Sequence, residues 1–136
     1  ITLENYCKTV NIEALTMVDM ARKQILPAAE EAIAALADAC EKKLSVCKNL
    51  SGAYEKKQIT ALSALVEEID RATEELENAE IAYKAVSDVT EASQRIRDVL
   101  LPKMAALRAV ADEAETMIPA KYRPFPDYAD LLFGVR

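Results

Sequence analysis

Histidine is absent from this 136-residue chain, and glycine occurs only at positions 52 and 134. Without histidine the chain lacks the commonest general base, the Ser/His and Cys/His nucleophile pairs and the usual zinc ligands. A glycine-rich phosphate loop cannot form with glycines so far apart. Sandwiches and barrels need many tight turns, so two glycines also argue against an all-β fold. The sequence therefore predicts no catalytic, cofactor-binding or metal-binding residue in this chain.

Basic residues are in the minority, with 17 Lys and Arg against 23 Asp and Glu, and the net charge is −6. Such a chain has no overall positive field to attract nucleic acid or an anionic membrane. The longest stretch without a formal charge is nine residues, 58–66, whereas a membrane span needs about 20. We expect a soluble, cytoplasmic chain with no nucleic-acid or membrane partner. Because Ile1 is neither an initiating Met nor the start of a signal peptide, we expect a longer parent protein or a processed start.

Cysteine is scarce as well, since there are only three. Cys40 and Cys47 are seven residues apart in a helical segment, which separates them by about 10 Å along the axis, too far for a disulfide. We expect both to be small core residues in a reducing compartment.

What the chain does contain is typical of one helical domain, with 51% hydrophobic and 29% charged residues. A first helical stretch runs from about Lys8 to Lys48 and is interrupted at Pro27. Its second half carries one apolar stripe, but residues 10–21 are apolar around most of the circumference, which requires burial on several sides. We therefore predict a partner surface there. The residues predicted to form it are Ile12, Leu15, Met17 and Val18.

Two further helices follow, and both show apolar residues at spacings of three and four. The second runs from about Ala53 to Val86, after Ser51-Gly52 ends the first, with polar interruptions of its seam at Thr73 and Glu80. The third starts near Asp88, a helix-capping residue, and continues to Ile118. The predicted fold is all-α: an up-down-up bundle of three long helices, over residues 1–120. Pro27 and Pro102 fall at nearly the same height, so we expect kinks in the first and third helices at one level.

Residues 121–136 form a tail rich in proline and aromatic residues. Prolines at 119, 124 and 126 forbid a continued helix, and the tail is too apolar to remain free. We expect it to pack on the bundle or on a partner. Its predicted contact residues are Tyr122, Phe125, Tyr128, Leu131, Leu132 and Phe133.

An acidic run, residues 67–80, resembles a carboxylate metal site only superficially. Most of its side chains lie outside the apolar seam of the helix, so a solvent-exposed helix face explains the acidic run better than a metal site does. Glu80 is the exception, and we expect it at the rim of the core or paired with a Lys or Arg from the first or third helix.

Two segments resemble a known family. Residues 11–21 (NIEALTMVDMA), leading to residues 25–28 (ILPA), are similar to the start of the C-terminal helical region of type III glutamine synthetases. Residues 121–133 (KYRPFPDYADLLF) resemble the closing segment of that family. Arg123 stands where tryptophan is usual, and Ala129 where glycine is usual.

The resemblance implies a parent enzyme that joins ammonia to glutamate with ATP and Mg or Mn, and whose catalytic domain lies upstream of Ile1. This chain would then be a non-catalytic, structural part of a homo-oligomeric ligase, in contact with its own catalytic domain and with neighbouring subunits. The alternative is a free-standing helical-bundle module for protein interaction.

Overall fold

The computed structural model describes residues 2–123 and is built of helices throughout that range. The first helical arm is continuous and consists of α1 (Leu3–Met20), the π-helical turn η1 (Ala21–Ile25) and α2 (Leu26–Val46). The second is α3 (Ala53–Lys84). The third consists of α4 (Val89–Arg95), the π-helical turn η2 (Ile96–Leu100) and α5 (Leu101–Met117), followed by one 3₁₀ turn, η3 (Ala120–Tyr122).

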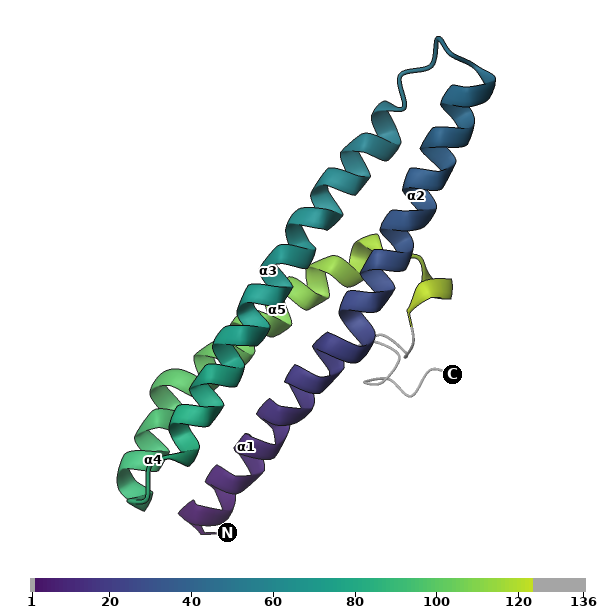
Figure 1. The fold of residues 1–136 in the computed structure, drawn as a ribbon. Coiled ribbons are helices and arrows are strands. Elements are labelled where there is room, and N and C mark those ends of the chain that lie inside the picture. The colour runs from purple at the N-terminus through teal and green to yellow at the C-terminus, as the bar shows by residue number, and fades with distance from the viewer. Residues whose placement is uncertain (1, 124–136) are drawn as a thin grey trace.

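The three arms run up, down and up, which confirms the predicted bundle (Figure 1). The middle helix, α3, packs against α1 and α2 on one side and against α5 on the other. Two further contacts tie the third arm to the first, because α4 contacts α1 near the N-terminus and η3 contacts α2. A single core therefore runs along α3.

The apolar seam predicted on α3 is the centre of that core. Leu62, Ile69 and Leu76 are fully buried, and the second row contributes Leu65 and Ala79. Facing them are small residues of the first arm, such as Ala14, and larger ones of the third, such as Leu100 and Leu107. Alanines from α1, η1 and α2 pack in one core with leucine, isoleucine and methionine from α3, η2 and α5, and their small size lets the arms approach closely.

Each of the two prolines inside an arm lies two residues beyond the end of a π-helical turn. Proline cannot donate a backbone hydrogen bond, and its ring clashes with the carbonyl four residues earlier. The residue before each proline bonds five residues back instead: the Leu26 N–H donates to Ala21 O, and the Leu101 N–H donates to Ile96 O. This register change accommodates the ring without ending the helix. A bend at Pro27 and Pro102 stays a prediction.

The start of the third arm is capped as the sequence predicts, whereas the connection between the first and second arms differs from the prediction. The Asp88 carboxylate accepts a hydrogen bond from the Glu91 N–H at 2.9 Å, as a helix cap does. Gly52, in contrast, does not directly follow the first arm, which already ends at Val46. It immediately precedes α3 with φ of +66°, a left-handed conformation that favours glycine. A Cβ added there would lie 2.7 Å from the Cys40 Sγ atom, so close packing also requires glycine.

The cysteines are free, and one of them corrects a prediction. Cys40 is buried, as expected, but Cys47 is exposed just beyond the last turn of α2. The expectation that Cys47 is a core residue is therefore wrong. Helical periodicity no longer applies once the helix has ended at Val46.

Candidate interaction surface

The described residues, 2–123, contain no cluster of three or more His, Cys, Asp or Glu side chains that could hold a metal ion. No helix in that range combines the length and apolarity needed to cross a membrane. The candidate functional features are therefore surfaces and buried polar groups.

The α1 helix divides the predicted partner segment into an inner and an outer face. Val18 is 6% exposed and belongs to the core, together with Ala14 and Val10 one and two turns earlier. Ile12 and Leu15 point outward and are 63% and 42% exposed. Three residues apart on a helix, these two side chains are neighbours on one face. They form what we call the outer pair, Ile12 and Leu15.

Met17 lies between the two faces. It packs partly against the core, and its Sδ atom accepts a hydrogen bond from the Arg108 Nη2 atom at 3.7 Å. Of the four residues predicted to meet a partner on this helix, the structure therefore leaves Ile12 and Leu15 available, covers part of Met17 and buries Val18. Sequence periodicity could not separate them because all four are apolar.

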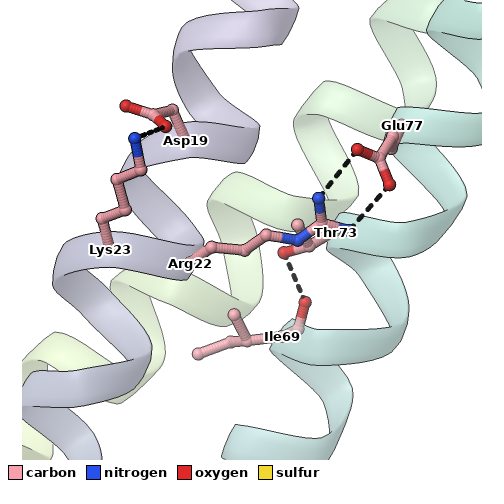
Figure 2. Close-up of polar contacts among 6 residues, drawn as sticks. All are labelled: Asp19, Arg22, Lys23, Ile69, Thr73 and Glu77. Carbon is pink, nitrogen blue, oxygen red and sulfur yellow. Dashed lines mark hydrogen bonds and ion pairs between the residues drawn. The ribbon is translucent and has the colours of Figure 1, made fainter.

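Ion pairs connect the first and third arms to a single turn of α3. Arg22, in the π-helical turn η1, donates two hydrogen bonds to the Glu77 carboxylate, at 2.7 and 2.8 Å (Figure 2). Lys103, at the start of α5, donates to the Glu75 carboxylate at 2.6 Å. The hydrogen bond from Arg22 holds the pKa of Glu77 below its ordinary value, and that from Lys103 does the same for Glu75. Carboxylates from the acidic run thus join helices.

The two polar interruptions of the α3 seam are both buried. Thr73 is 1% exposed, and its hydroxyl donates to the Ile69 carbonyl oxygen at 2.7 Å, so it is satisfied within its own helix (Figure 2). Glu80 is 2% exposed and lies 3.6 Å from the Lys84 Nζ atom, while its Oε2 atom is buried without a hydrogen bond. The prediction for Glu80 was wrong on both counts: it lies in the core, and its ion-pair partner comes from its own helix.

A second buried carboxylate lies at the turn between the first two arms. Glu55 is 5% exposed and accepts a hydrogen bond from the Lys43 Nζ atom at 2.9 Å. That bond is the main cause of a lowered pKa for Glu55. Together with Gly52 it ties the end of α2 to the start of α3. The sequence pattern does not identify Glu55, because it lies in the first turn of α3, two residues beyond the start of that helix.

The end of the described chain lies beside a groove. Tyr122 is partly buried and lines this groove, together with residues of α2, the first turns of α3 and the last turn of α5. The other predicted tail contacts lie outside the described residues; they are Phe125, Tyr128, Leu131, Leu132 and Phe133.

Comparison with known proteins agrees with the resemblance seen in the sequence. Residues 1–44 match the family model described as the glutamine synthetase C-terminal domain. Over 148 aligned positions that include the whole chain, the sequence is 32% identical to a glutamine synthetase of Butyrivibrio fibrisolvens. The chain spans only 19% of the length of that relative. Given both matches, this chain belongs to the family of glutamine synthetase C-terminal domains.

Proposed function

We propose that this chain is the helical C-terminal region of a cytoplasmic type III glutamine synthetase, and that its role there is structural. The parent reaction is the ATP-dependent ligation of ammonia to glutamate to give glutamine. The observation that carries the proposal is the 32% identity with a glutamine synthetase, which extends over all of this chain yet over only 19% of the relative. The two segments that resemble the type III family, residues 11–28 and 121–133, support the finer assignment.

The side chains support a structural role because they do not fit the cofactors of the parent reaction. ATP with Mg or Mn requires converging carboxylates or phosphate-binding backbone. In the described range, Glu75 and Glu77 are already engaged by Lys103 and Arg22 from the neighbouring arms. We therefore place ATP, metal and all bond-making chemistry in the remainder of the parent chain.

The outer pair on α1 supports an assembly role. Ile12 and Leu15 expose adjacent apolar side chains on a helix whose opposite face is fully engaged in the core. Covering such side chains with an apolar partner surface is favourable, by about 25 cal/mol per Å² removed from water. We propose that the catalytic domain of the same chain or a neighbouring subunit covers this pair.

The family assignment is tested on the complete product of the gene that encodes this chain. We expect that product to consume ATP and form glutamine from glutamate and ammonia. Absence of a ligase domain from the gene, or of this activity from its product, would refute the assignment.

The assembly role needs a separate test. In the complete product, Ile12→Asp combined with Leu15→Asp should shift the particle to smaller oligomers, measured by light scattering after size-exclusion chromatography. Val46→Asp is the matched control, because Val46 is 83% exposed and lies at the other end of the first arm. An unchanged particle size for the double variant, or an equal loss in the control, contradicts the assembly role.

A further inference from the structure

A groove of about 240 Å³ opens where the end of the chain meets the first arm. Its floor is formed by small side chains of α2, and its walls come from the start of α3, the end of α5 and η3. An apolar cavity of about 150 Å³ is enough to hold benzene, so this groove has room for one phenyl ring. Gln58 and Lys121 contribute polar side chains to the lining, and its other residues include Ala35, Leu36, Ala39, Tyr54, Met117 and Tyr122.

The groove is chemically suited to an aromatic side chain. Tyr54 stands at its edge and is 64% exposed, so much of its ring has no neighbour. Met117 contributes a thioether, which makes favourable contacts with aromatic rings. A second ring placed beside Tyr54 would add an offset or edge-to-face contact, which is worth about 0.5–1.5 kcal/mol beyond area burial.

The chain itself delivers an aromatic residue to this place. Tyr122 lines the groove, and Phe125 follows three residues later. Three residues of fully extended chain span about 10 Å, so a ring at position 125 has the reach to enter the groove. Pro124 and Pro126 flank Phe125 and restrict the unfolded chain, which lowers the entropic cost of fixing the segment.

We propose that the groove is a docking site for Phe125 of the same chain, whose ring packs between Tyr54 and Met117 and ties the C-terminal segment to α2 and α3. A tether this short gives the segment an effective concentration in the millimolar range, which favours the chain's own groove over that of a second copy. The proposal does not depend on the ligase assignment, because it uses only residues of this chain.

Tryptophan is absent from the sequence, so Phe125→Trp introduces a single tryptophan, whose emission can be excited selectively over that of the tyrosines. In the folded 136-residue chain we expect its emission to lie at shorter wavelength than in the same variant unfolded in urea, and to resist quenching by acrylamide. The shift should not depend on protein concentration, since the contact is within one chain.

A pair of charge substitutions on α2 locates the contact. Ala39 lines the groove and is exposed, whereas Ala34 is an exposed alanine of the same helix outside the groove lining. Ala39→Glu added to Phe125→Trp should move the emission towards the unfolded value, while Ala34→Glu should leave it in place. Circular dichroism confirms that both variants keep their helices.

Each other outcome overturns the proposal. An emission equal to that of the unfolded chain means that Phe125 is not docked. A shift that survives Ala39→Glu, or is lost equally with Ala34→Glu, assigns the ring to another surface. A shift that appears only as protein concentration rises assigns the groove to a second copy.

Discussion

Replacing the buried Glu80 by methionine should stabilise the bundle. The Glu80 carboxylate is 2% exposed, its Oε2 atom has no hydrogen bond, and its ion-pair partner Lys84 lies 3.6 Å away with a side chain 58% exposed. At that separation two unit charges attract by about 1 kcal/mol in water and about 5 kcal/mol at an effective dielectric constant of 20. Because Lys84 is so exposed, the lower figure applies better.

Desolvation works against that attraction. Removing an ion from water costs several kcal/mol after relaxation, and replacing a buried ion pair by a well-packed apolar side chain is often neutral or stabilising by about 1–4 kcal/mol. Methionine is flexible enough to fill the space of the glutamate side chain. We expect Glu80→Met to raise the free energy of unfolding by about 1–3 kcal/mol and the melting temperature by several degrees.

Urea unfolding followed by circular dichroism at 222 nm measures this change at pH 7. Glu68→Met is the matched control, because Glu68 is exposed on the same helix, and its effect should stay within about 0.5 kcal/mol. Lys84→Met should destabilise, since it removes the charge nearest to the buried carboxylate. If Glu80→Met instead loses 1 kcal/mol or more while the control is neutral, the carboxylate contributes net stability and the reasoning is refuted.

Three further changes test the packing and the ion pairs. Leu76→Ala should cost about 2–5 kcal/mol in urea unfolding, because the side chain is fully buried at the centre of the seam; a loss below 1 kcal/mol would contradict that placement. Gly52→Ala should destabilise by more than about 1 kcal/mol, from its positive φ and from the clash with the Cys40 Sγ atom, and Cys40→Ala should recover only the steric part; complete recovery would show that the backbone is not strained. The lowered pKa of Glu77 adds stability that is present above the unfolded-state pKa of about 4.3 and is lost as the pH falls through the folded-state pKa. Glu77→Gln should therefore reduce the fall in melting temperature between neutral and acid pH. If the variant and the unsubstituted chain give parallel curves of melting temperature against pH, the ion pair from Arg22 does not stabilise the fold in solution.

Local sequence was sufficient for the number, order and direction of the helical arms. The spacing of apolar residues on α3, the capping residue Asp88 and the scarcity of glycine each act within a few residues of the chain, so they can be recognised without knowing what packs where. The same holds for the family, because residues 11–28 and 121–133 are recognisable as strings of letters.

Tertiary structure decided which faces are used. All-round apolarity of residues 10–21 indicated a partner surface, but only the approach of α3 shows that Val18 faces inward and that Ile12 and Leu15 face outward. Glu80 was a polar interruption in the apolar pattern of α3, and its burial beside the exposed Lys84 depends on how closely the arms pack around it. The π-helical turns before Pro27 and Pro102 depend on a backbone register that side-chain spacing does not encode. The hydrogen bonds from Arg22 to Glu77 join segments that are distant in the sequence. Periodicity is a property of one helix, whereas burial and pairing are properties of several helices together, and this is why the first could be predicted and the second could not.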